Sequence, residues 1–597
     1  YIDLGVNRIF VEGDIVQDDG SGAYGGNVTL VAADIILNAD IITGTDAEGE
    51  GGLISLIPAY QHTNITITGY NVDGNTLTDS ELGRQWVFDM NNLPHLQTDG
   101  GISIGAPGHH GELRFDGLGA DVNLDGPAAW TFFGGNTVFA GNTSFGSAAV
   151  NLFATGSITG SGTVSANSLY AESKGGFELE TELAQIAVRN QDGDVIINNN
   201  GALLLDNSFT SNGDFIASTH SPLTVIGNVS TIGTGDITLS SSGGDPLTVN
   251  SGVTINSAGS LNLIAPSTGN IVLCDGPGAV ELLATLSINL DADAIVIDQA
   301  DLALSAGSLI SRAESISGDG ALDTSLVNLT NFTGANVVVD LDNITLGQTI
   351  ADGDLKLDGA VELLGKLEVA GDLILDSAGN LVNADIFADS ADIKANTIAN
   401  SSIVAASGDL VFDAKDLYNL NVSAGANIDG QNVDGNIVGG SYVATDDITF
   451  DKANTIASAD FDASDNVTLV ANGGNIKQVN VRANDDAKLT VTSGSILGTT
   501  VVAGTAAELT ALEGIDQSSV SLAAGSLLLD ATQIANSSFT AQTGDLIFKA
   551  KDLYNLTVSA NASIDGDAVT GNIIGGSYVA TNNISFADAA YIASLGL

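Results

Sequence analysis

The sequence predicts an all-β protein built as a right-handed parallel β-helix, an elongated solenoid of stacked coils. One supporting observation is a Gly-Asn or Gly-Asp pair that recurs along the chain, each time before a short run of alternating apolar and polar residues. A second is the spacing of these pairs, which is 20, 22 and then 34 residues from Gly193 to Gly269. We interpret the 34-residue interval as two turns of about 17 residues. Recurrence every ~17–22 residues, with two or three strands per period, is what a parallel β-helix requires.

The third observation is a duplication. Residues 395–461 and 531–597 align without a gap at an offset of 136, and about 42 of about 67 positions are identical. The segment Ala414–Leu420 recurs at Ala550–Leu556, and Gly439–Thr445 recurs at Gly575–Thr581. A gap-free repeat predicts that each 136-residue period holds a whole number of coils, about seven at this spacing.

The composition narrows the class of protein. Of 597 residues, 16 are Lys or Arg and 72 are Asp or Glu, which gives a net charge of −56. That charge argues against binding nucleic acid or anionic membrane surfaces, both of which need clustered cations. The apolar residues, 44% of the total, come in short regular bursts, so disorder is disfavoured. No run of ~18 apolar residues is present, which predicts no membrane span.

Cysteine usage and the first residue bear on the cellular location. Cys274 is the only cysteine, so no internal disulfide can form, and we interpret it as a small apolar residue in a strand-like run. Without a disulfide, the stability of the fold must come from the stacking of coils on one another. The chain opens at Tyr1 without Met or a signal-peptide pattern, so we expect any export signal to lie upstream or to have been removed.

Taken in order, residues 1–77 are predicted to form N-terminal coils. Gly26–Asn38 shows the local pattern, in which a turn leads into a strand with Val28 and Leu30 on one face. Thr78–Gln97 lacks this pattern and holds the only Met and one of the two Trp residues. We interpret residues 78–97 as a loop or short helix packed over an early coil.

Residues 98–394 are predicted to form the β-helix body. Its first part concentrates aromatic residues, namely Trp130, Phe132, Phe133, Phe139, Phe145 and Phe153. Inside successive coils these rings would form an internal ladder, and on the outside they would form a platform for sugars. Glu178–Ile186 fits either a helical turn or a strand, and Thr505–Ile515 has apolar spacing that predicts one or two helical turns ending at Gly514.

The remaining segments are the repeat copies, residues 395–530 and residues 531–597, the second being truncated or continuing into a next segment. In total we expect some 25–30 coils, which at the ~4.8 Å strand spacing gives a rod of roughly 120–145 Å. Ala589–Leu597 is small and apolar with no polar cap. We therefore expect Leu597 to abut another β-helical segment, either in a longer chain or head to tail in a polymer.

The glycine, alternating strand and Asn/Asp turn motifs resemble the repeat regions of filamentous-haemagglutinin-like adhesins, large secreted bacterial surface proteins. The motifs that carry the resemblance are Gly26–Asn38, Gly235–Ser240, Gly259–Ala265 with Gly269–Leu273, and Gly371–Leu381. The resemblance implies a right-handed parallel β-helix on a cell exterior, serving adhesion or acting as a structural fibre. The secretion domain of that family is not recognisable in Tyr1–Ile57.

Catalytic and metal-binding alternatives have little support in the sequence. A polysaccharide lyase needs clustered acids with Arg or Lys, yet only six arginines are scattered along the chain. Gly108-His109-His110-Gly111 has the form of a hydrolase histidine motif, but no Arg/Lys-rich partner motif follows. We therefore predict no enzyme activity, no catalytic residues, no cofactor and no defined metal site. Ca²⁺ remains an option at local acid clusters, which are Asp14 with Asp18 and Asp19, Asp192 with Asp194, Asp291 with Asp293, and Asp485 with Asp486.

Sequons of the form Asn-x-Ser/Thr are frequent, and most are expected from composition. They include Asn27, Asn64, Asn142, Asn228, Asn328, Asn331, Asn343, Asn421, Asn466, Asn555 and Asn583. Outward ones would be glycosylated in a source that modifies surface proteins, whereas inward asparagines could form hydrogen-bonded ladders.

Three functions follow as hypotheses. The first is a structural extracellular filament or surface fibre that associates with itself end to end. The second is the stalk of a secreted adhesin that binds glycans or a host or neighbouring cell surface through Thr78–Gln97 or the aromatic region. The third, disfavoured, is a polysaccharide lyase or hydrolase.

Overall fold

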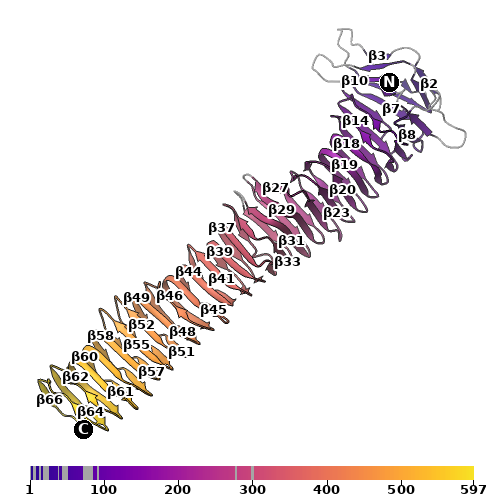
Figure 1. The fold of residues 1–597 in the computed structure, drawn as a ribbon. Helices are drawn as coiled ribbons and strands as arrows, with labels where there is room; N and C mark the ends of the chain where they lie inside the picture. Colours follow the sequence, from indigo (N-terminus) through magenta and orange to yellow (C-terminus); the bar gives the residue numbers. More distant parts are fainter. Residues whose placement is uncertain are drawn as a thin grey trace. The chain divides into compact units, whose positions relative to one another are not determined.

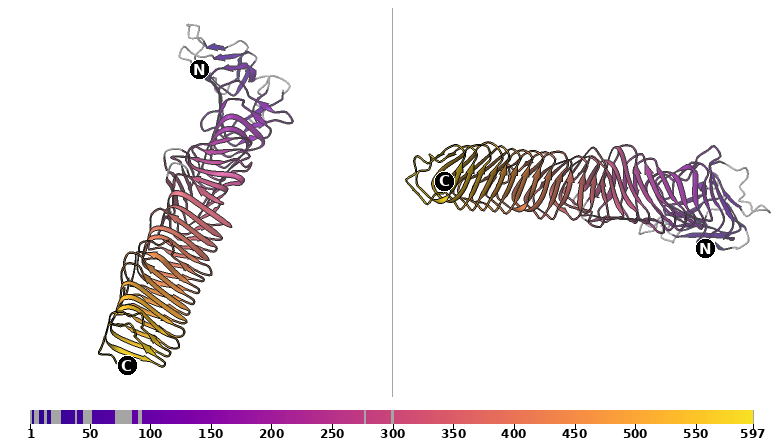
Figure 2. Two further views of the ribbon diagram at one scale, coloured as in Figure 1. Left: turned by 60° about the vertical axis from the view of Figure 1, so that its left-hand side comes forward. Right: turned by 90° about the horizontal axis from the view of Figure 1, so that it is seen from below.

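The computed structural model describes residues 2–3, 8–11, 15–17, 26–37, 39–43, 52–70, 85–89, 93–275, 278–297 and 301–596. The chain divides into two compact units. Unit 1 comprises residues 1–313 with 318–320, and unit 2 comprises residues 314–317 with 321–597. Each unit is a stack of parallel β coils (Figure 1), which Figure 2 shows from two further sides. The all-β, parallel β-helix prediction is confirmed, with about 25 turns in the chain.

A coil of unit 1 consists of three short strands joined by tight corners. One coil is formed by β20 (Val195–Asn199), β21 (Leu203–Leu205) and β22 (Ser208–Thr210). The next coil repeats this order with β23 (Phe215–Thr219), β24 (Leu223–Val225) and β25 (Val229–Thr231). Each strand pairs in parallel with its counterpart one coil away. Backbone hydrogen bonds therefore run between coils, and no coil is complete by itself.

The core lies inside the coils because side chains alternate along every strand. In β20 and β23 every second residue is buried and the residues between them are partly exposed. Val195, Phe215, Ile237 and Leu261 stack at one inward position of four successive coils, and all four are fully buried. Period-two alternation thus gives one apolar face to the interior and one polar face to solvent.

The Asp of the recurring Gly-Asp pair has a role between coils. Asp194 Oδ1 accepts a hydrogen bond from the backbone N–H of Asp214 at 2.9 Å, and Asp214 Oδ1 accepts one from Asp236 at the same distance. Each carboxylate therefore satisfies the backbone of the coil stacked on it. Several sequon asparagines do the same for the next coil, namely Asn27, Asn64, Asn142, Asn228 and Asn466.

In unit 2 this column alternates between acid and amide. Asp409, Asn427, Asp447, Asn466 and Asp486 occupy equivalent positions on five coils, and each of the first four side chains accepts from the backbone N–H of the next residue in the column. Asn466 also donates its Nδ2 to Asp447 Oδ1 at 2.9 Å. Alternation places an uncharged amide between successive carboxylates and so limits like-charge repulsion within the column.

Replacing Asp447 with alanine should destabilise unit 2 locally by about 1.5–3 kcal/mol, because two hydrogen bonds to a charged acceptor are lost. Hydrogen exchange at the amide of Asn466 and at its neighbours in β52 (Val467–Ala471) would measure the change. Asp462→Ala is the matched control, since that acid lies on the outer face of β51 (Asp460–Ala463) and should change stability by less than ~0.5 kcal/mol. Equal effects of the two variants would show that the column does not stabilise the stack.

The two repeat copies fold in the same way. In the first, Leu417, Leu420 and Ala424 of β46 (Leu410–Ala424) pair with β48 (Asn436–Ala444). The matching residues of β62 (Leu546–Ala560) pair in the same register with β64 (Asn572–Ala580). Seven successive coil-to-coil pairings lead from Leu410 to Leu546. The predicted seven coils per 136-residue period are therefore confirmed.

The helical prediction for Thr505–Ile515 is wrong. All of the segment after Thr505 lies in β58 (Ala506–Asp516), which pairs with β55 (Asp486–Val491) and with β60 (Leu527–Ala535). The two flanking strands offer backbone partners along most of the segment, and these pairings outweigh the local helical spacing. Glu178–Ile186 is likewise strand, within β19 (Phe177–Asn190).

The interpretation of the 34-residue interval is also wrong. Ile237 pairs with Leu261 and Leu261 pairs with Ile288, so these coils are longer than 22 residues and Gly269 does not stack on Gly235. The corners take up the added residues, while the paired strands keep their alternation. Coil length is therefore not constant along unit 1.

Part of Thr78–Gln97 is described. Gln85–Phe88 forms β9, which pairs with β8 (Asn64–Thr68), and Leu93–His95 forms the 3₁₀ helix η1, followed by β10 (Leu96–Thr98). Trp86 is buried and donates its Nε1–H to the Ala33 carbonyl at 2.7 Å. The rest of this segment lies outside the described residues. Over the part of the chain that is described, no helix is long and apolar enough to cross a membrane.

Candidate binding cleft on unit 1

The aromatic region divides into an inner and an outer set. Phe115 of β12 (Leu113–Asp116) stacks on Phe139 of the next coil, with ring centroids 4.4 Å apart and planes within 4°. Trp130, Phe132, Phe139 and Phe145 are all buried with it. Trp130 also donates its Nε1–H to the Leu124 carbonyl at 3.0 Å. The predicted internal ladder is therefore confirmed for these four residues.

Phe133 and Phe153 belong to the outer set. Phe133 follows Phe132 in β14 (Ala129–Gly134), so strand alternation turns it to the outside. It pairs with Phe153 of β17 (Ala149–Ala154), and their rings stack at 5.0 Å with planes within 14°. Both rings are partly exposed. These two residues match the alternative prediction of an outward aromatic surface.

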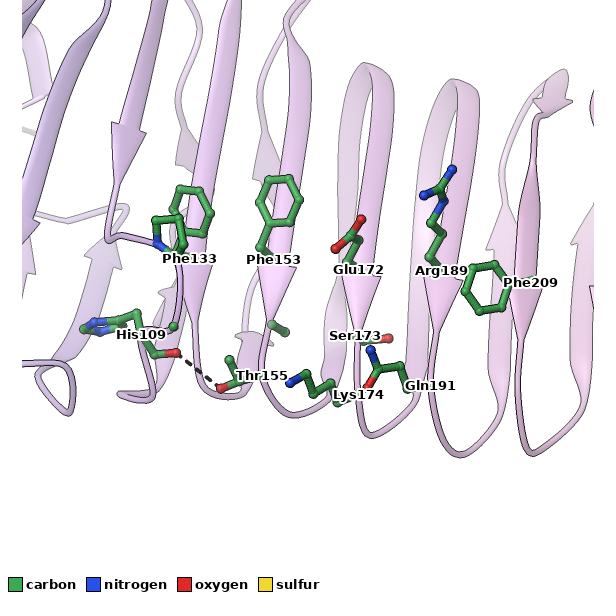
Figure 3. Close-up of a pocket in the computed structure, with 13 residues that line it drawn as sticks. His109, Phe133, Phe153, Thr155, Glu172, Ser173, Lys174, Arg189, Gln191 and Phe209 are labelled. Atoms are coloured by element: carbon green, nitrogen blue, oxygen red, sulfur yellow. Dashed lines mark hydrogen bonds between the residues drawn. The ribbon is translucent and has the colours of Figure 1, made fainter.

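At the same outward position, the next three coils carry side chains of different chemistry. Phe153 pairs with Glu172 of β18 (Ile158–Ser173), Glu172 pairs with Arg189 of β19, and Arg189 pairs with Phe209 of β22. Figure 3 shows these residues in a row along one face. A carboxylate and a guanidinium thus lie between the phenyl rings of Phe153 and Phe209 in this row. Only the pairing register brings Glu172, Arg189 and Phe209 together, so the sequence alone does not reveal them.

This row forms one wall of a cleft with a volume of about 420 Å³. Turn residues form the other wall (Figure 3). The lining comprises Pro107, Gly108, His109, Phe133, Phe153, Ala154, Thr155, Glu172, Ser173, Lys174, Arg189, Gln191 and Phe209. Apolar rings combined with a few charged and polar groups are typical of sites for small organic ligands. A larger groove on unit 2, of about 560 Å³, has no aromatic lining residue.

The charges of the cleft are arranged unevenly. The Tyr170 hydroxyl donates a hydrogen bond to Glu172 Oε1, and burial together with this carboxylate raises the pKa of Tyr170 to about 12. Tyr170 therefore stays protonated and keeps Glu172 in place. The Arg189 guanidinium lies 5.7 Å from the centroid of the Tyr170 ring. Within the described residues, neither Arg189 nor Lys174 forms an ion pair with a carboxylate.

The two histidines of Gly108–Gly111 support the turn beside the cleft. His109 is buried and its Nε2 lies 2.7 Å from the Thr63 carbonyl, so that nitrogen carries the proton and donates it. Burial lowers the pKa of His109, which favours the neutral ring. The His109 carbonyl in turn accepts a hydrogen bond from the Thr155 hydroxyl at 3.2 Å. These contacts hold the turn in place.

The acid clusters that lie within the described residues do not converge on a metal site. In the part of the chain that is described, no group of three or more His, Cys, Asp or Glu residues is placed to hold a metal ion. Asp194 instead accepts from the next coil, as described above. Asp291 lies opposite Arg312 of the next coil in the strand register. Asp14, Asp18 and Asp19 lie outside the described residues, as does the side chain of Cys274.

Comparison of the chain with protein-family models, curated proteins and solved structures gave no match.

Proposed function

We propose that the chain is part of a structural fibre or stalk on a cell exterior, of the kind found in filamentous-haemagglutinin-like surface proteins. The observation that carries this proposal is the duplication of residues 395–461 at 531–597, with identical registers in β46–β48 and β62–β64 and seven coil steps from one copy to the other. A solenoid gains length by adding coils without any change to the rest of the fold. The length of the solenoid is therefore the property that such a duplication changes most directly.

End-to-end association would use the edges of the stack. Ile592 in β66 (Tyr591–Ala593) occupies the repeat position of Ile456. Ile456 is buried under Ile476 of the following coil, whereas Ile592 is 47% exposed. A further coil would cover Ile592, whether it comes from the same chain or from a second copy. Such a contact is heterologous and does not close, so between copies it would produce filaments.

Electron microscopy of the purified chain tests this proposal. We expect uniform filaments one solenoid wide, because parallel strand edges template further stacking. The imaging should be repeated with a calcium chelator. Filaments that separate in chelator would place Ca²⁺ at the junctions, and filaments that persist would show that stacking alone holds them. Particles that remain single at high protein concentration would contradict self-association.

A second candidate function is that of an adhesin stalk, and the cleft on unit 1 favours it. The cleft combines three outward phenyl rings, those of Phe133, Phe153 and Phe209, with the guanidinium of Arg189. Tryptophan fluorescence does not report binding there directly, because neither Trp86 nor Trp130 lines the cleft. Ligand titrations observed by NMR provide the test.

A further inference from the structure

We propose that the cleft on unit 1 binds a saccharide unit that carries a carboxylate, such as a uronic acid residue in a polysaccharide. This inference rests on the second candidate function and names its ligand class. It is carried by the row Phe153, Glu172, Arg189 and Phe209, in which each residue belongs to a different coil.

The phenyl rings of the cleft offer apolar surface to a sugar ring. Phe153 and Phe209 are three coil steps apart, which corresponds to roughly 14 Å at the usual strand spacing. One face of Phe153 is covered by Phe133, and its other side is turned toward Glu172 and Tyr170. The C–H bonds of a pyranose form an apolar, weakly positive face, which packs well against the negative face of an aromatic ring. The cleft can therefore hold one sugar ring against a phenyl wall.

The carboxylate is assigned to Arg189. Its guanidinium offers several donors in a plane and has no carboxylate partner among the described residues, so it can bind a planar carboxylate through two hydrogen bonds. Lys174, at the turn end of the same cleft, adds a second positive charge. Two cations in one cleft stand out in a chain with only 16 Lys and Arg residues.

The high negative charge of the whole chain does not prevent this contact. The Debye length is about 8 Å at physiological ionic strength, so most of the distant acids are screened from a ligand in the cleft. Glu172 is the one carboxylate in the lining, and it lies beside Arg189 in the pairing and accepts from Tyr170. Its remaining lone pairs can accept hydrogen bonds from sugar hydroxyls. The cleft therefore recognises both an acid group and hydroxyl groups.

The test is a titration of the full chain with a galacturonic acid trimer and with the neutral galactose trimer, observed by saturation-transfer NMR and calorimetry. We expect saturable binding of the acidic trimer, with the neutral trimer at least about tenfold weaker. Arg189→Gln and Phe153→Ala should each weaken binding of the acidic trimer by about tenfold or more. Both side chains are on the outer face, and circular dichroism would verify that the variants fold.

Arg482→Gln provides the matched control. Arg482 is an exposed outward residue of β54 (Asn480–Ala483) in unit 2, and its replacement removes the same charge away from the cleft. Equal weakening by Arg189→Gln and Arg482→Gln would overturn the proposal in favour of diffuse electrostatics. Equal binding of the neutral trimer would overturn the acidic ligand class but leave an adhesin role. No binding of either trimer would overturn the inference and leave the fibre proposal untouched.

Discussion

Replacement of Phe115 with alanine is expected to destabilise unit 1 by about 3–5 kcal/mol. Phe115 is fully buried, stacks on Phe139, and makes edge contacts with Phe132 at 5.1 Å and with Phe145 at 5.9 Å between ring centroids. Its removal leaves a cavity surrounded by three rings, each held by backbone pairing to a neighbouring coil. The surroundings can close that cavity only by disturbing several coils, so the cost should lie in the upper part of the range for large-to-small substitutions.

Native-state hydrogen exchange is the suitable measurement, because a stack of coils can open locally rather than all at once. Amides of β12 and of β15 (Thr137–Phe139) should lose protection, while those of unit 2 should not. Phe153→Ala is the matched control, since its ring is on the outer face and partly exposed. A loss of protection in that variant as large as in Phe115→Ala would show that inward stacking is not what stabilises these coils.

The sequence was sufficient to predict the parallel β-helix and the seven coils of the 136-residue repeat period. Both depend on periodicity, which survives in the sequence because equivalent residues of stacked coils meet the same environment. The same reasoning failed for the 34-residue interval between Gly235 and Gly269. Corners of a coil can lengthen without disturbing the strands, so glycine spacing reports coil length only where the corners are uniform.

Local sequence patterns were less informative about structure where backbone pairing between coils determines the conformation of a segment. The apolar spacing of Thr505–Ile515 fits a helix, yet the strands on either side bind its backbone and impose an extended conformation. The cleft is a stronger example. Phe133 and Phe153 were recognised as aromatic, but Glu172, Arg189 and Phe209 are separated by 17–20 residues and meet only through the coil register. A one-residue shift in any of these strands would turn its residue inward.

A buried asparagine beneath the cleft provides the second large expected effect. Asn190 is fully buried, and its Oδ1 accepts from the Ser173 hydroxyl at 2.7 Å and from the Gly176 N–H at 3.1 Å. Its Nδ2 donates to the carbonyls of Asp192 and Gly193 at 2.9 and 2.6 Å. This side chain thus satisfies the corners of two successive coils.

We expect Asn190→Leu to cost about 3 kcal/mol or more, because several buried polar groups lose a side-chain partner at once while the branched shape of the side chain is kept. Hydrogen exchange at Gly176 and Gly193 would measure the loss. Asn198→Leu is the control, since Asn198 lies on the outer face of β20 and bonds only to Glu180 at 2.9 Å, so its loss should cost less than ~1 kcal/mol. Similar values for the two variants would contradict a structural role for Asn190.

The same pair of variants connects stability with binding. Asn190 lies between Arg189 and Gln191, which both line the cleft, and its partner Ser173 precedes Lys174. Loss of the buried hydrogen bonds should therefore displace the cations of the cleft as well as loosen the corners. Asn190→Leu is expected to abolish binding of the acidic trimer, whereas Asn198→Leu should retain it. Retained binding in Asn190→Leu would mean that the strand pairing of β18, β19 and β22 positions Arg189 without help from the corner beneath it.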